Sequence, residues 1–239
     1  MFNRISSTTL GLLMLVLLLG STAGNTSNYY VLGWSVAVLI LASLVINFKR
    51  LNFTWPHLLL PIIYLISSGS IFAIITDSTW RLVFLIVASV VFGILEMKLG
   101  RESHFLQNVY LLSVFGLYLA LFAVEFYFDL QIWWFVLAVF ALTYFLAIQG
   151  FAGFDLPAKK YFYLLLAMIC AEAAWGLSFW PIYFLAAAVI LFCFYYVLWL
   201  FAFSAFFGRL TRQKVYWQLA LVTIVLFLTL STAAWKPLT

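Results

Sequence analysis

Nine long apolar runs, separated by turns of only a few residues, constrain this chain more than any other feature. Each run is long enough for an α-helix to cross about 30 Å of hydrocarbon at a rise of 1.5 Å per residue. A helix also satisfies its own backbone hydrogen bonds, which lipid cannot do, and the runs lack the period-two alternation of barrel strands. The pattern predicts an all-α, polytopic transmembrane helical bundle of about nine spans, forming a single transmembrane domain over residues 1–239. The runs lie at about 6–24, 29–47, 57–75, 80–97, 106–127, 130–149, 160–179, 182–206 and 214–235.

Charged residues are too few for a water-soluble protein. They make up 8% of the chain, against roughly 25% in soluble domains. The net charge of +5 does not indicate nucleic-acid binding, because the basic residues sit in short turns and form no continuous stripe. The predicted partners are therefore the lipid bilayer and other membrane proteins, with no nucleic acid.

The distribution of Lys and Arg predicts the orientation. When the turns alternate between two sides, ten basic residues fall on one side, and only Arg81 and Lys236 fall on the other. The positive-inside rule makes the first side cytoplasmic, with the N-terminus inside and the C-terminus outside. We expect a multi-pass protein of a bacterial cell (inner) membrane. The ten cytoplasmic residues are Arg4, Lys49, Arg50, Lys98, Arg101, Lys159, Lys160, Arg209, Arg212 and Lys214.

The first run has a second interpretation. Arg4, the run Leu10–Leu19 and the small residues Ser21–Ala23 resemble the three zones of a secretory signal. Cleavage after Ala23 would leave eight spans with both termini outside. A retained span is the favoured interpretation, because the run is long for the core of a signal once residues 5–9 are included.

Glu172 is the most informative polar residue. It lies about 18 Å along its span from Lys160 at helical rise, past the middle of the bilayer. Intramembrane ionisable residues cost on the order of 3 kcal/mol and so require a reason. Trp175 follows at i+3, on the same helical face. Two interpretations stay open: a proton-coupling or cation-binding group, and a structural hydrogen bond to a neighbouring helix, which is favoured.

A second polar group is predicted near the outer face. It consists of Asp77, Arg81, Glu125 and Asp129. Arg81 opens its helix and is expected to reach a carboxylate, either Glu125 or Glu172. Such a pair would form an outward-facing polar site or, as is favoured, a structural salt bridge that holds two helices together. Glu172, Trp175, Arg81 and Glu125 together are the candidate intramembrane polar site.

The remaining polar features favour packing over chemistry. Ser67–Ser70 follow Pro61 within one run, and such residues either allow close helix contact, the favoured interpretation, or mark a broken helix. Both cysteines, Cys170 and Cys193, lie in apolar runs and are expected in the core.

No metal site or cofactor is predicted. Glu96, Glu102 and His104 share a short turn that is expected to be solvated, and His57 lies at another inner edge, but their spacing fits no zinc pattern. The motifs GxSxG, HExxH and GxxxxGK[ST] are absent from the sequence. Ser/His/Asp catalysis within the membrane would need an embedded histidine, but both histidines lie at the inner rim, so the sequence does not predict an enzyme.

The last third of the chain, about residues 170–236, resembles an uncharacterised family of bacterial multi-spanning membrane proteins from reduced-genome lineages. That resemblance implies a membrane location without an assigned activity, and it adds weight to Glu172, Trp175 and Arg212. The residues that carry it are Glu172-x-x-Trp175, the segment to Pro181, Tyr195-Tyr196, Leu210-Thr211-Arg212 and Thr232-x-x-Trp235.

Three functions remain open on the sequence alone. The favoured one is a non-enzymatic membrane component or accessory subunit. The alternative is a small ion-coupled or solute transporter that uses Glu172. The third, with less support, is an enzyme that acts on a lipid-linked substrate at the outer face through Asp77, Arg81, Glu125 or Asp129.

Overall fold

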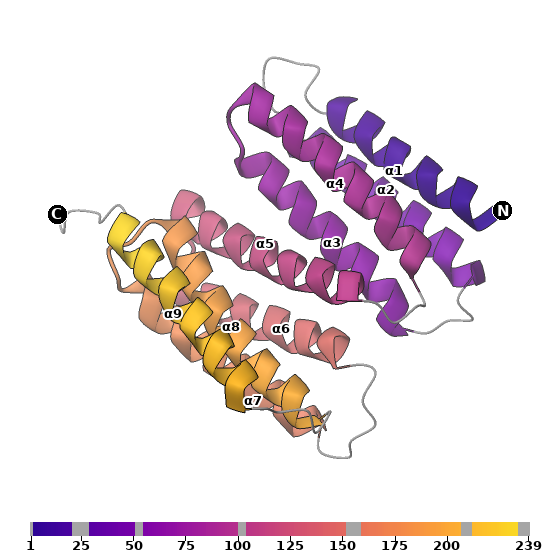
Figure 1. Ribbon diagram of the computed structural model, residues 1–239. Helices are drawn as coiled ribbons and strands as arrows, with labels where there is room; N and C mark the ends of the chain where they lie inside the picture. The colour runs from indigo at the N-terminus through magenta and orange to yellow at the C-terminus, as the bar shows by residue number, and fades with distance from the viewer. Residues whose placement is uncertain are drawn as a thin grey trace. The chain divides into compact units, whose positions relative to one another are not determined.

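A computed structural model describes residues 2–20, 29–50, 55–99, 104–151, 159–206 and 212–233. These residues form nine α-helices and no β-strand (Figure 1). Seven of the helices are long and apolar enough to cross a membrane, which confirms the prediction of a polytopic helical membrane protein. The helices are α1 (Phe2–Gly20), α2 (Tyr29–Arg50), α3 (Trp55–Ile74), α4 (Ser78–Lys98), α5 (His104–Phe128), α6 (Ile132–Gly150), α7 (Lys159–Ser178), α8 (Phe184–Phe206) and α9 (Arg212–Thr232).

The exact number of spans and their orientation stay predictions. Within α1 and α3 the described apolar stretches are shorter, Thr9–Gly20 and Leu59–Ile74. Ala23, after which the alternative interpretation places a signal cleavage, falls outside the described residues.

The helices assemble into two compact units, residues 1–117 and residues 118–239. Helix α5 carries residues of both, because the division falls between Leu117 and Tyr118. The single domain expected over residues 1–239 stays a prediction.

In residues 1–117, helix α1 packs against α4 and α2, and α3 packs against both α2 and α4. Leu10, Met14 and Leu18 of α1 are buried. The α1–α4 contact is close, because a Cβ added at Gly11 would lie 3.0 Å from the backbone oxygen of Ser89. Small residues allow such close approach between helices whose surroundings are as apolar as their interfaces.

In residues 118–239, the packed pairs α6–α7, α7–α8 and α8–α9 are neighbours in sequence. The core contains a polar contact, since the hydroxyls of Tyr118 and Thr143 lie 2.8 Å apart and both residues are fully buried. The ring of Tyr118 also meets Tyr195 edge to face, with 5.9 Å between centroids. Both cysteines are buried, as expected.

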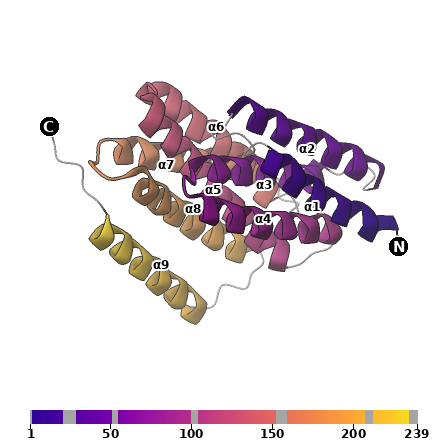
Figure 2. The same cartoon turned by 90° about the horizontal axis from the view of Figure 1, so that it is seen from above.

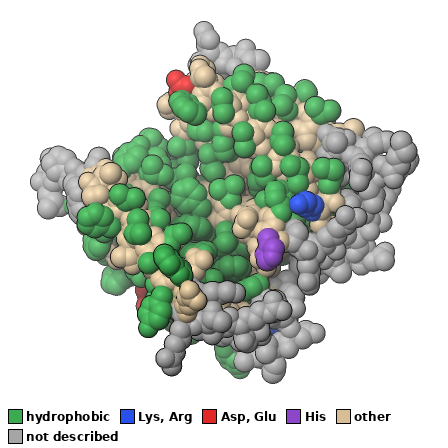
Figure 3. Space-filling model, in the orientation of Figure 1, with side chains coloured by type: hydrophobic (Ala, Val, Ile, Leu, Met, Phe, Trp, Pro, Cys, Tyr) green, Lys and Arg blue, Asp and Glu red, His purple; other side chains and the backbone are tan. Residues whose placement is uncertain are grey.

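The outer surface of the helices is apolar. Hydrophobic side chains cover most of the described surface that faces the viewer in Figure 3. Helix α9 lies alongside α8 (Figure 2), and Val222 is the only buried side chain among its described residues. Exposed aromatic side chains stand near helix ends, where amphipathic rings prefer the membrane–water interface. These include Trp80, Tyr127, Trp133, Trp134, Trp180 and Trp217.

Candidate functional site

Glu172 lies on the outer surface of α7, and its side chain is exposed. Trp175, one turn further, is 47% exposed, and its ring meets Phe179 edge to face at 5.6 Å. At helical rise Glu172 is about 18 Å from Lys160 and about 9 Å from Ser178. The carboxyl therefore stands within the length of a helix that can cross the bilayer, away from the packed interior. Glu172 and Trp175 share one face, as the spacing predicts.

Arg81 and Asp77 both form hydrogen bonds with backbone groups at the turn between α3 and α4. The carboxylate of Asp77 caps α4 by accepting hydrogen bonds from the backbone N–H of Thr79 and of Trp80, both at 2.9 Å. Arg81 donates from Nε and Nη2 to the carbonyl oxygen of Ile75, at 2.9 and 2.5 Å. These contacts satisfy backbone groups that a helix end leaves without partners. Arg81 thus ties the end of α3 to the start of α4.

The guanidinium of Arg81 has a further contact within the same unit. It lies over the ring of Phe72, 5.6 Å from its centroid, a distance at which cations are attracted to aromatic faces. Arg81 belongs to residues 1–117, whereas Glu125 and Glu172 belong to residues 118–239. A single site formed by Arg81, Glu125 and Glu172 therefore stays a prediction.

Asp129 and Glu125 lie at the end of α5. Asp129 follows the last helical residue with a φ of 49°. This left-handed conformation is common where helices end, and aspartate adopts it more readily than most residues. Asp129 therefore has a structural role in ending α5. Glu125 is half-buried.

The chain matches no protein-family model, no curated protein and no solved structure. The resemblance to an uncharacterised bacterial membrane family thus stays a prediction. Of the residues that carry it, Leu210, Thr211 and Trp235 lie outside the described residues, as does the side chain of Arg212.

A buried polar cluster in residues 1–117 was not predicted from the sequence. Glu96 was expected in a solvated turn, and that expectation was wrong, because its side chain is only 1% exposed. Ser43 Oγ donates to Glu96 Oε1 at 2.6 Å, and Asn47 Nδ2 donates to Glu96 Oε2 at 2.8 Å. The cluster Ser43–Asn47–Glu96 joins α2 to α4 through three side chains that are almost fully buried.

The sequence did contain a signal for this cluster. Ser43 and Asn47 are four residues apart in an apolar run, so they share one helical face. A pair of polar side chains on one face of a span requires a partner on a neighbouring helix. Asn47 Nδ2 also approaches Ser43 Oγ at 3.2 Å, while nothing among the described residues donates to Asn47 Oδ1.

The residues considered and rejected as metal ligands lie apart where the structure describes them. His104 is exposed at the start of α5, whereas Glu96 is buried. Glu102 and the side chain of His57 lie outside the described residues. No group of three His, Cys, Asp or Glu side chains among the described residues is placed to hold a metal ion.

The segment Ser67–Ser70 supports close packing. Helix α3 continues unbroken through Pro61 and this segment. A Cβ added at Gly69 would lie 2.8 Å from Val36 Cγ2 on α2. Ser68 Oγ donates to the carbonyl of Tyr64 at 2.8 Å, so its hydroxyl is satisfied within the helix. The favoured interpretation is confirmed, and the broken helix is not observed.

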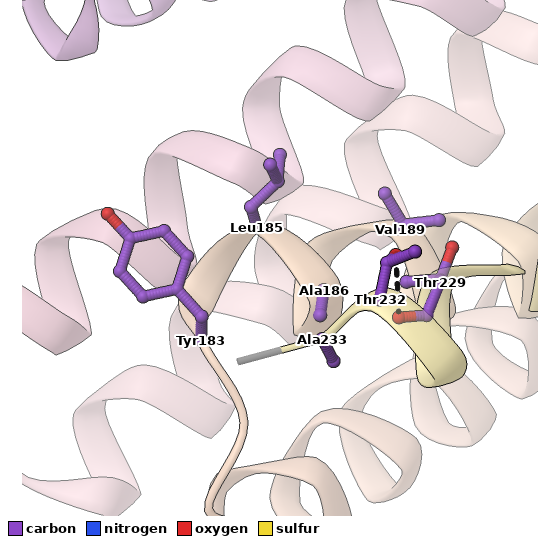
Figure 4. A pocket seen from close by; sticks show the side chains of 7 residues that line it. All are labelled: Tyr183, Leu185, Ala186, Val189, Thr229, Thr232 and Ala233. Carbon is purple, nitrogen blue, oxygen red and sulfur yellow. Dashed lines mark hydrogen bonds between the residues drawn. The ribbon is translucent and has the colours of Figure 1, made fainter. Parts of the chain in front are cut away.

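A hollow of about 310 Å³ lies between the start of α8 and the end of α9 (Figure 4). Its two threonine hydroxyls are used within α9: Thr229 Oγ1 donates to Val225 O at 2.8 Å, and Thr232 Oγ1 donates to Leu228 O at 2.7 Å. The lining is suited to an apolar ligand such as an acyl chain. It comprises Tyr183, Leu185, Ala186, Val189, Thr229, Thr232 and Ala233.

Proposed function

We propose that this chain is a non-enzymatic component of a membrane-protein assembly, an accessory subunit of the bacterial cell membrane. The observation that supports the proposal is the exposure of Glu172 on the outside of α7. A carboxyl group facing hydrocarbon costs on the order of 3 kcal/mol. A protein partner that offers a hydrogen-bond donor or a positive charge to this surface would remove most of that cost.

An enzyme at the outer face has less support. Asp77 and Arg81 bind the backbone at helix ends, and Asp129 ends α5. The hollow between α8 and α9 is lined mostly by apolar side chains. These observations give three of the four proposed catalytic residues structural roles.

A transporter that uses Glu172 remains the alternative. It requires a polar cavity that includes this carboxyl, whereas Glu172 lies on the exposed face of α7 and does not line the hollow. The buried cluster Ser43–Asn47–Glu96 is polar but fully enclosed by packed helices. Assembly through the surface of α7 therefore has more support than conduction.

The test is to isolate the full-length tagged chain from its native membranes in a mild detergent and to measure its mass by native mass spectrometry. We expect a complex heavier than the 27.3 kDa chain, with a partner in fixed stoichiometry. Leu137→Gln, at an exposed position on α6, is the control and should keep the complex. A chain that stays alone, and that supports pH-dependent solute flux in vesicles abolished by Glu172→Gln, would overturn the proposal in favour of a transporter.

A further inference from the structure

The exposed face of α7 forms a continuous stripe with one carboxyl in it. The α7 stripe comprises Leu165, Met168, Glu172, Trp175, Gly176 and Phe179, all of which are exposed. Their spacing of three and four residues places them on one side of the helix. The opposite side, which includes Ala167, Cys170 and Ala174, is buried. The stripe is therefore the surface that α7 turns away from its own unit.

Gly176 leaves a notch one turn after the carboxyl. A Cβ built at this position meets no atom within 4 Å, so the notch is open to a helix from outside. Gly inside a helix costs about 0.5–1 kcal/mol relative to Ala, and it contributes no packing within the chain. Beside it, Trp175 and Phe179 form an aromatic ridge. A notch and a ridge next to a carboxyl are features by which one transmembrane helix can hold another closely.

Where the structure describes the helices, no Lys or Arg occupies the middle turns, the part of α7 in which Glu172 lies. Every Lys and Arg of the sequence lies in the first or last turns of a helix or between helices. Arg81, in the first turn of α4, is engaged at the carbonyl of Ile75. A second copy packed symmetrically on the α7 stripe would set Glu172 against Glu172 and would bring no positive charge to it. Charge complementarity therefore favours a different protein.

We propose that the α7 stripe binds a transmembrane helix of another protein, one that carries a Lys or Arg at the depth of Glu172. The inference rests on the proposed function and names the chemistry of the partner. The cation neutralises the Glu172 carboxylate, the partner backbone enters the notch at Gly176, and Trp175 packs beside it. Basic residues within membranes pair with acidic ones for the same reason, since each otherwise faces hydrocarbon alone.

The test uses synthetic transmembrane peptides of Leu and Ala in phosphatidylcholine vesicles that contain the full-length chain. One peptide carries a Lys at the depth of Glu172, a second carries Leu there, and a third carries Glu. Energy transfer between a label on the chain's tag and a label on the peptide measures binding. We expect the Lys peptide to bind about tenfold more tightly than the Leu peptide. Glu172→Gln should remove that preference, and Glu172→Lys should transfer it to the Glu peptide.

Two further variants test whether binding of the Lys peptide requires the α7 stripe or only an exposed carboxyl anywhere on the membrane-facing surface. Gly176→Leu keeps the carboxyl but fills the notch, and it should weaken binding of the Lys peptide. The double variant Leu137→Glu with Glu172→Gln moves the carboxyl to an exposed position on α6, and it should not restore binding. Equal binding of Lys and Leu peptides to the unaltered chain, or full binding by the double variant, would overturn the inference. If a native complex is nevertheless isolated, the proposed function stands and only this inference fails.

Discussion

Two carboxyl groups within the helices, Glu96 on α4 and Glu172 on α7, have opposite surroundings. Glu96 is 1% exposed and accepts hydrogen bonds from Ser43 and Asn47. Glu172 is exposed on the outside of its helix. In residues 1–117 the chain supplies donors to its own carboxyl. On α7 the carboxyl is directed outward, and we propose that its donors belong to another protein. Burial and exposure therefore separate a structural carboxyl from one available for recognition.

The largest effect should come from removing the buried carboxyl. Glu96→Ala leaves Ser43 and Asn47 buried without their acceptor, and it should lower the free energy of unfolding by about 2–4 kcal/mol. Denaturation in mixed micelles by titration with SDS measures this difference. Glu96→Gln is the matched control. It keeps an oxygen for Ser43, and rotation of the Asn47 amide can present Oδ1 to the new amide, so we expect a loss of about 1 kcal/mol. Equal losses in both variants would contradict this account of the cluster.

A pair of glycines extends the comparison from polar groups to packing. At Gly116 on α5, an added Cβ would collide with Ser67 Oγ and lie 2.8 Å from Ile71 Cδ1. Gly116→Ala should cost about 1–3 kcal/mol, because the packed side chains of Ser67 and Ile71 on α3 must move. Gly176→Ala meets open space and should stabilise the isolated chain by about 0.5–1 kcal/mol. The same micelle titration measures both variants. A loss of stability in Gly176→Ala would show that another part of the chain already packs against this face of α7.

The hydrogen bond of Tyr118 tests whether a buried contact between neutral side chains stabilises the fold less than the buried carboxyl of Glu96. Its hydroxyl lies 2.8 Å from Thr143 Oγ1 in the core of residues 118–239. Tyr118→Phe removes this hydrogen bond and keeps the ring against Tyr195, so a loss of about 1 kcal/mol is expected. The double variant with Thr143→Val, assayed in the same micelles, should recover part of that loss, because no buried hydroxyl then lacks its partner. Additive losses would show that the two side chains do not interact.

The smallest effect on stability should come from Glu172 itself. Glu172→Leu removes no contact that holds the chain together, so the free energy of unfolding in micelles should change by less than about 0.5 kcal/mol. The partner complex should nevertheless be lost from native membranes, as judged by its mass. A loss as large as that of Glu96→Ala would place Glu172 in the fold and end the contrast between the two carboxyls.

The helices themselves could be predicted from the sequence. The run at 80–97 corresponds to α4, Ser78–Lys98, and the run at 106–127 corresponds to α5, His104–Phe128. Length and apolarity suffice for this, because lipid excludes unpaired backbone groups and leaves helices as the solution. Asp77 before α4 also follows the preference for aspartate at helix starts.

The faces of the helices could not be predicted in the same way. A soluble helix shows its core side by a stripe of apolar residues, whereas a helix in lipid is apolar on all sides. Nothing in the run around Glu172 therefore indicated that it points outward, and nothing around Glu96 indicated that it points inward. Ser43 and Asn47 gave a usable signal only as a pair on one face. The partner of that pair depends on which helices meet, which is a property of the fold.

The pairing of α1 with α4 has a consequence for biosynthesis. Helix α4 ends 78 residues after α1 does, at Lys98 against Gly20. At about 5–20 residues per second, the ribosome needs about 4–16 s to deliver the helix that packs against α1 at Gly11. During this interval only α2 and α3 are available, so the nascent α1 must wait in the membrane with part of its interface covered by lipid or by the insertion machinery. The later pairs α6–α7 and α7–α8 can close as each hairpin emerges. An arrest of translation between α3 and α4 would therefore leave α1 without one of its two packing partners.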